Sequence, residues 1–146
     1  MTRTSSHRLI LPGDANHYGT LYAGTLLRLA LEAGYATAWK HVGATANLVL
    51  RRVLNLECQR PVPVGTVIEI EGAVLHCTRA YLVTGLLGKP LKPGEGPWLE
   101  ALFGFAQVDQ AGKVDPLPEG VGPAVTPAEP AWQRLSERME KVLHLR

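Results

Sequence analysis

The segment of residues 20–41, TLYAGTLLRLALEAGYATAWKH, is long, apolar and rich in Leu and Ala. This composition and length favour an α-helix over a strand. Its polar residues form only a thin stripe, which consists of Thr25, Arg28 and Glu32. A helix that is apolar on most of its faces must be covered by other elements. We therefore expect the rest of the chain to wrap around this helix.

The segments on either side of the helix have the pattern of β-strands. A short β-like run at residues 7–11 precedes the helix and is stopped by Pro12 and Gly13. Four longer β-like segments follow the helix, namely ANLVLRRVLNLEC, TVIEIEGAVLHC, RAYLVTGLLG and WLEALFGFAQVD. Gly72, within the second of these, predicts a β-bulge. One buried helix followed by a run of antiparallel strands predicts an α+β fold in which a sheet wraps around the helix.

The C-terminal part of the chain indicates a linker and a second helix. The linker PLPEGVGPAVTP is rich in proline and is expected to be extended. The second helix is predicted to open at Thr126, with Pro127 at its first position. Apolar residues at helical spacing predict that this helix is amphipathic; they are Trp132, Leu135, Met139, Val142 and Leu143. We expect residues 1–122 to form one domain and residues 123–146 to form the linker and this helix.

Composition excludes several classes of protein. The chain has 146 residues, the size of one domain, and a formal net charge of +2, too small to imply nucleic-acid binding by itself. No apolar run approaches the length of a membrane span, and the N-terminal residues MTRTSSHR lack the apolar part of a signal peptide. Cys58 and Cys77 do not have the spacing of metal ligands. We expect a cytoplasmic protein without a metal and without nucleic-acid or membrane partners.

A polar turn, PGDANHYG, lies directly before the long helix. Asp14 and Asn16 are common turn residues that could build an Asx-type turn and cap the helix. Alternatively, they could present polar groups to a substrate at the helix N-terminus, where backbone N–H groups have no intrahelical partner. The residue pattern alone leaves both interpretations open.

The turn and the helix together, PGDANHYGTLYAGTLLRLALEAG, resemble the signature of hot-dog-fold acyl-CoA thioesterases, especially the cytosolic acyl-CoA hydrolase branch. The matching positions are Pro12, Asp14, Asn16, Gly19, Gly24, Glu32, Ala33 and Gly34. The later segment RRVLNLECQRPVPVGTVIEIEGAVLHCTRAYLVTGLLG is similar to the strand region of the same family. The resemblance covers about residues 7 to 120. It implies a hot-dog fold, an antiparallel sheet around one long helix.

The resemblance also implies a reaction, the hydrolysis of acyl-CoA to a free acid and coenzyme A. Asn16 and the helix N-terminus at Ala23 and Gly24 would polarise the thioester carbonyl, and Glu32 would act as base or nucleophile. The family's carboxylate usually stands one position earlier, at Leu31, which is about 100° away around a helix. An ion pair between Arg28 and Glu32 is the alternative for Glu32.

The substrate would be held by three further positions, Arg60, Thr78 and Arg79. The two arginines are candidates for the phosphates of coenzyme A, although Arg79 could also be a solvated charge at a strand end. No cofactor is expected besides the coenzyme A that forms part of the substrate.

Proteins of this family usually build the site between two subunits, with the amide of one chain facing the acid of the other. We expect a homo-oligomer with a dimer as the minimal unit, because a single curved sheet leaves an edge and a face uncovered; a tetramer or a trimer of dimers is the larger alternative. Two other functions stay open. One is a non-catalytic acyl-CoA-binding protein, in which Leu31 marks a lost carboxylate. The other is an (R)-specific enoyl-CoA hydratase, although Gly19 stands where that enzyme has its His.

Overall fold

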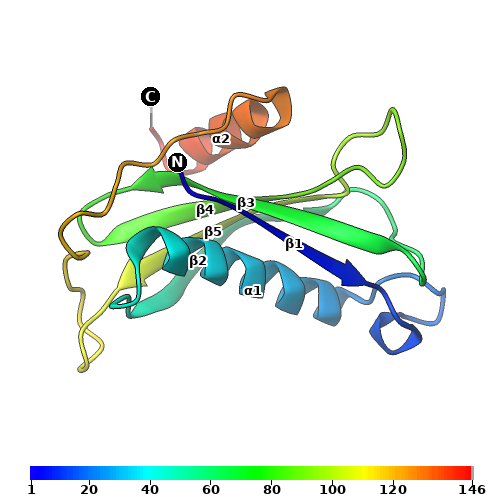
Figure 1. Ribbon diagram of the computed structural model, residues 1–146, viewed down its shortest axis with the longest axis horizontal. Coiled ribbons are helices and arrows are strands. Elements are labelled where there is room, and N and C mark those ends of the chain that lie inside the picture. Colours follow the sequence, from blue (N-terminus) through cyan, green and yellow to red (C-terminus); the bar gives the residue numbers. More distant parts are fainter. Residues whose placement is uncertain (146) are drawn as a thin grey trace.

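The computed structural model describes residues 1–145 and contains one antiparallel sheet with a helix on each face (Figure 1). The strands are β1 (Arg3–Leu9), β2 (Leu48–Cys58), β3 (Val67–Cys77), β4 (Tyr81–Gly88) and β5 (Leu99–Gln107), in the spatial order β1-β3-β4-β5-β2. Helix α1 (Ala23–Val42) lies on one face and α2 (Pro130–Val142) on the other, and a short 3₁₀ turn, η1 (Pro12–Asp14), precedes α1. The expected α+β arrangement is confirmed.

The sheet separates two cores, one beneath each helix. Successive side chains of a strand point to opposite faces, so Leu82 and Leu86 of β4 join the core beneath α1, whereas Val83 and Leu87 join the core beneath α2. Every residue of β4 after Tyr81 is buried. This double burial explains why YLVTGLLG is largely apolar, with Thr84 as a buried polar exception, and does not alternate.

Gly72 of β3 allows α1 to approach the sheet closely. A Cβ at this position would overlap the hydroxyl of Thr37 on α1 and would stand 2.6 Å from the hydroxyl of Thr4 on β1. These two hydroxyls are 2.7 Å apart and form a hydrogen bond across the glycine. The prediction of a bulge at Gly72 is wrong, because the irregularity in β3 falls between Val74 and His76.

The sheet covers only one side of α1 within a single chain. The buried residues of α1 lie on one face; they are Leu26, Ala30, Gly34, Thr37, Ala38 and Val42. Outside this set, Leu27, Tyr35 and Trp39 remain 48%, 39% and 43% exposed. The apolar surroundings expected for this helix are therefore incomplete in the isolated chain. No helix within residues 1–145 combines the length and apolar character required to cross a bilayer.

Strand β2 is an edge of the sheet, and its apolar side chains are exposed. It pairs only with β5, and Val49, Leu50 and Val53 are 40%, 41% and 51% exposed. Leu50 lines a hollow together with Tyr35 of α1. We call the exposed residues on the α1 face of this edge (Tyr35, Leu50 and Val53) the β2 edge surface. Apolar side chains beside an unpaired strand edge are typical of an interaction surface.

Helix α2 packs on the outer face of the sheet through Trp132, Leu135 and Met139, so the predicted amphipathic pattern is confirmed. Its predicted start at Thr126 is wrong, since the helix begins at Pro130. Glu129 precedes that proline and is extended, with ψ of 144°. A residue before proline is disfavoured in the α conformation, so Glu129 ends the linker.

Polar contacts tie the two ends of the chain to the body. At the C-terminal end of α1, Nε2 of His41 donates to the Gly122 carbonyl at 2.9 Å, and the Thr2 hydroxyl lies 2.8 Å from Nδ1 of the same ring. Arg3 of β1 forms an ion pair with Glu129 at 2.8 Å. The N-terminal strand and the linker before α2 are thus fastened at neighbouring points.

Candidate active site

The polar turn before α1 holds one end of the Asn16 amide and leaves the other end free. The side-chain oxygen accepts hydrogen bonds from the N–H of Tyr18 at 2.9 Å and from both the N–H and the hydroxyl of Thr20, each at 3.2 Å. Gly19 completes the turn with φ of 76°, a conformation that favours glycine. No acceptor for the Asn16 NH₂ group is found within the described residues, so the group is available as a donor.

Asp14 anchors this turn and is not exposed to a ligand. Its carboxylate accepts hydrogen bonds from the N–H of Leu11 at 2.9 Å and from the Arg8 guanidinium at 2.7 Å. The bond from Leu11, followed by the contact with Arg8, holds the pKa of Asp14 below its ordinary value. Its carbonyl accepts the N–H of Tyr22, the residue that caps α1. Asp14 therefore connects β1 with the start of the helix.

The first turn of α1 offers further donors beside Asn16. Tyr22 provides no side-chain cap, and the first N–H groups of a helix have no intrahelical acceptor. Ala23 and Gly24 are exposed. A Cβ at position 24 would lie 2.6 Å from the Tyr22 ring, so glycine allows that ring to lie against the first turn. Together with the helix dipole, these N–H groups can stabilise negative charge.

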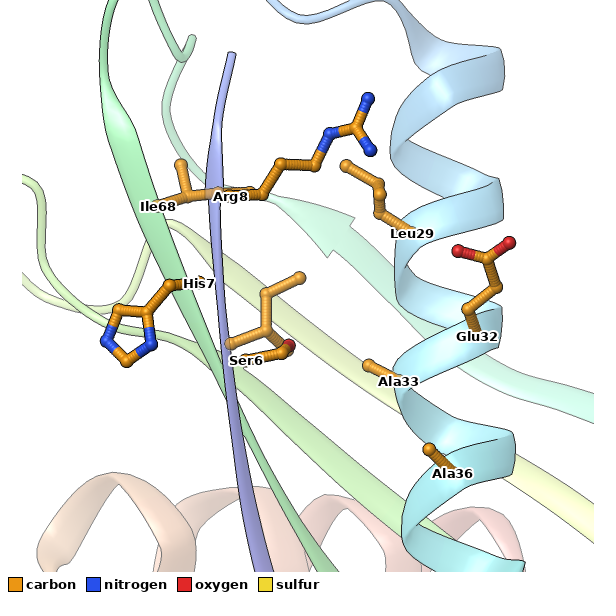
Figure 2. A pocket seen from close by; sticks show the side chains of 9 residues that line it. Ser6, His7, Arg8, Leu29, Glu32, Ala33, Ala36 and Ile68 are labelled. Carbon is orange, nitrogen blue, oxygen red and sulfur yellow. The ribbon is translucent and has the colours of Figure 1, made fainter.

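Glu32 lies on the exposed side of α1. The ion pairs of residues 1–145 do not include Arg28 with Glu32, so the expected alternative of a surface ion pair is not observed. Glu32 borders a groove of about 340 Å³ between β1 and α1 (Figure 2). It also borders a second hollow of about 330 Å³, on the β2 side of the helix.

Figure 2 shows how the groove between β1 and α1 is built. The Arg8 side chain extends from β1 toward α1, and its Nε is buried without a partner within the described residues. The His7 ring points away from the helix and lies 3.4 Å from Glu69. Arg8 is therefore the cation that faces this groove.

Leu31 faces the β2 edge. It lines the second hollow with Tyr35, Leu50 and Phe105, and it packs against the core beneath α1. The position that carries a carboxylate in the family pattern is thus directed toward the β2 edge surface. Glu32 lies about 100° further around the helix and lines the same hollow.

The structure brings Arg60 to the same end of α1 as Asn16, Ala23 and Gly24. The N–H of Leu21 donates to the Val62 carbonyl at 2.8 Å, and Thr20 and Pro63 form an isolated β-bridge. Arg60 lines a cavity of about 420 Å³ beside this bridge. Sequence reasoning did not identify Lys92, which lines the same cavity from the loop of residues 89–97.

The remaining predicted site residues lie elsewhere in the chain. Glu32 is nine residues beyond Ala23, or about 14 Å along the helix axis. Thr78 and Arg79 form the turn between β3 and β4, where the Thr78 hydroxyl donates to the Tyr81 carbonyl at 3.3 Å. Since β3 spans roughly 30 Å, this turn lies at the far end of the sheet from Arg60.

Sequence reasoning also did not identify Thr20, which holds the Asn16 side chain through two hydrogen bonds. The one sequence signal for this role was a hydroxyl residue four positions after Asn16.

Among residues 1–145, no group of three or more His, Cys, Asp or Glu side chains could hold a metal ion. The N–H groups at the N-terminal end of α1 and the carboxylate of Glu32 are groups suited to carbonyl chemistry. The former can stabilise an oxyanion and the latter can accept a proton.

The comparisons with known proteins agree on one family. Residues 18–95 match the family described as the Thioesterase superfamily. A hexameric acyl-CoA thioesterase, solved in its apo form, is 30% identical; the match covers 98% of this chain and 92% of that chain, with a TM-score of 0.74. No curated protein matches the sequence.

Two bacterial structures have the same fold. An acyl-CoA hydrolase from Staphylococcus aureus, solved with butyryl coenzyme A and coenzyme A, is 19% identical; the match covers 98% of this chain and 82% of that chain, with a TM-score of 0.78. A hexameric thioesterase from Yersinia pestis is 25% identical; the match covers 79% of this chain and 94% of that chain, with a TM-score of 0.67. Alanine variants of an asparagine and of an aspartate fifteen positions later were characterised in the Staphylococcus aureus hydrolase.

Proposed function

The chain belongs to the thioesterase superfamily and has the hot-dog fold, and we propose that it hydrolyses acyl-CoA thioesters to a free acid and coenzyme A. The observation that carries this proposal is the geometry of Asn16. Three donors hold its side-chain oxygen, so that its NH₂ group is free at the same end of α1 as the helix's first N–H groups. These are the donors that a thioester carbonyl needs.

In the proposed reaction, the thioester oxygen accepts hydrogen bonds from the Asn16 NH₂ group and from the N–H of Gly24. Glu32 removes a proton from a water molecule, which adds to the carbonyl carbon. The negative charge that develops on the oxygen is stabilised by these donors and by the helix dipole. The C–S bond then breaks, and the departing thiolate of coenzyme A takes up the proton that Glu32 removed from the water. Glu32 as nucleophile is the alternative route to the same products.

A complete site in this proposal requires two copies of the chain, because Asn16 and Glu32 are far apart within one copy. The β2 edge surface and the exposed side of α1 support such pairing. Related proteins of 30% and 25% identity are hexameric. We therefore propose a homo-oligomer with a dimer as the minimal unit, in which Asn16 of one protomer faces Glu32 of its partner.

One observation favours a second candidate, a protein that binds acyl-CoA without hydrolysing it. The separation of fifteen positions between the substituted asparagine and aspartate of the Staphylococcus aureus hydrolase equals the separation of Asn16 and Leu31 in this chain. By this comparison the carboxylate position holds leucine. Hydrolysis then depends on Glu32 reaching the substrate from the adjacent helical position.

Turnover of a panel of acyl-CoAs, followed with a thiol-trapping dye, separates the two candidates. Asn16→Asp keeps an oxygen for the turn but removes the NH₂ donor, and we expect kcat to fall about 10²–10³-fold, the usual effect of losing one oxyanion donor. Glu32→Ala should lower kcat about 10²–10⁴-fold, whereas Glu119→Ala, in the exposed linker, should have no effect. Normal turnover in Glu32→Ala would remove Glu32 from the mechanism. Binding of acyl-CoA without turnover in the unmodified protein would favour the binding protein.

A further inference from the structure

The cavity that contains Arg60 lies between the loop before β3 and the loop that joins β4 to β5. Its volume is about 420 Å³. Pro61, Pro63 and Leu91 contribute apolar walls, and Arg60 and Lys92 contribute two positive charges. A cavity lined by apolar residues and two cations fits a ligand that has an apolar part and an anionic part.

The guanidinium of Arg60 is incompletely satisfied. Its Nε is buried and has no hydrogen-bond partner within the described residues. Its ion pair with Glu95 is long, at 3.8 Å, and the ion pairs of residues 1–145 include none with Lys92. A buried donor without an acceptor costs free energy, and arginine binds phosphate oxygens with especially suitable geometry. The Arg60 side chain is 40% exposed, so an anionic ligand in the cavity can accept hydrogen bonds from its terminal NH₂ groups.

The cavity adjoins the polar turn that carries Asn16. Thr20 and Pro63 form a bridge, and the N–H of Val64 donates to the Gly19 carbonyl at 3.0 Å. A ligand in the cavity would therefore extend toward the N-terminal end of α1. Arg79, the other arginine considered for the phosphates, lies across the full length of β3 from this end.

We propose that this cavity binds the nucleotide end of coenzyme A, with the adenine against Pro63 and Leu91 and the phosphates at Arg60 and Lys92. The assignment rests on the proposed acyl-CoA substrate. It adds Lys92 and the loop of residues 89–97 to the binding site. Glu95 lies beside Arg60 as the one carboxylate of the cavity and would oppose the bound phosphates.

Binding of adenosine 3′,5′-bisphosphate to the full chain, measured by calorimetry, tests this assignment without turnover. Arg60→Gln and Lys92→Gln should each weaken binding about tenfold, which corresponds to about 1.4 kcal/mol. Glu95→Gln should strengthen binding, because it removes the opposing charge. Lys113→Gln, in the exposed turn after β5, is the matched control and should leave binding unchanged. Adenosine without phosphates should bind much more weakly than the bisphosphate.

Kinetics then separate this inference from the proposed reaction. Arg60→Gln and Lys92→Gln should raise KM for an acyl-CoA about tenfold and leave kcat unchanged. They should leave hydrolysis of the acyl N-acetylcysteamine thioester, which lacks the nucleotide, unchanged. An inactive protein that still binds the bisphosphate through Arg60 and Lys92 would contradict only the reaction.

Two results would overturn the nucleotide assignment. One is failure of the unmodified protein to bind the bisphosphate. The other is unchanged binding in both Arg60→Gln and Lys92→Gln, whether or not Arg79→Gln weakens binding. Lys92 is exposed on a loop, so the Lys92→Gln result stays decisive even if Arg60→Gln lowers the melting temperature.

Discussion

The backbone N–H and the hydroxyl of Thr20 both donate to the side-chain oxygen of Asn16, each at a distance of 3.2 Å. This double contact fixes which end of the amide is available. It also unites the two interpretations of the turn, because the same residue that forms the Asx-type turn presents a free NH₂ group.

Thr20 should therefore act as a positioning residue for Asn16. Thr20→Val removes one of the three hydrogen bonds to the amide oxygen, and one such bond contributes about 1 kcal/mol, so kcat should fall by up to about fivefold. Thr20→Ser keeps the hydroxyl and should retain the original kcat. Steady-state kinetics with one acyl-CoA measure both, with melting temperature as the control for folding. Equal kcat in the Val and Ser variants would show that the hydroxyl has no positioning role.

The β2 edge surface should be the contact between protomers. Leu50→Glu places a charge among apolar side chains that a dimer would bury, so the molar mass from light scattering should fall to that of the monomer. The matched control is Val67→Glu, because Val67 is 62% exposed at the start of β3 and lies outside this surface. An unmodified protein that is already monomeric at micromolar concentration would contradict the proposed two-chain site.

Gly72 should be essential for the packing of α1. Gly72→Ala forces the hydroxyls of Thr4 and Thr37 apart, and overpacking of this kind costs about 1–3 kcal/mol in the free energy of unfolding. Gly13→Ala is the control, since a Cβ there would meet no atom within 4 Å. Urea denaturation compares the two variants. Equal stability of Gly72→Ala and Gly13→Ala would mean that the helix shifts without strain.

The contribution of Asp14 to stability should depend on pH. Hydrogen bonds from Leu11 and Arg8 lower the pKa of its carboxyl in the folded state. The stabilisation is therefore fully present above the unfolded-state pKa of about 3.9 and is lost as the pH falls through the lowered folded-state pKa. The difference in unfolding free energy between the unmodified protein and Asp14→Asn should be largest near neutral pH and should shrink in this acidic range. Asp115→Asn is the control, and a pH-independent difference for Asp14→Asn would contradict this assignment.

The elements of the fold could be predicted because their signals are local. The helix expected at residues 20–41 is observed at Ala23–Val42, since helical periodicity depends on neighbouring residues. The start of α2 was misplaced because two prolines, Pro127 and Pro130, both fit a first helical position. A helix that began at Pro127 would include Glu129, and Pro130 disfavours the α conformation at Glu129. This constraint distinguishes the two prolines.

The candidate site was less accessible to sequence reasoning because it depends on atoms and on distant segments. The pattern singled out Asn16, but which end of its amide is free follows from hydrogen bonds that only coordinates reveal. Arg60 and Lys92 are brought to one cavity by two separate loops, which no spacing predicts. The large distance between Arg60 and Arg79, by contrast, could be predicted. Arg60 precedes β3 and Arg79 follows it, so the two arginines lie at opposite ends of this extended strand.

The imidazole of His41 contacts both Thr2, directly before β1, and Gly122 in the linker that leads to α2. Fraying at one terminus therefore loosens the anchor of the other, although the two termini are separated by almost the whole sequence. Local opening should consequently be cooperative, with amide protons at the start of β1 and in the linker around Gly122 exchanging with solvent as one unit. The proline-rich linker should therefore open together with the start of the N-terminal strand.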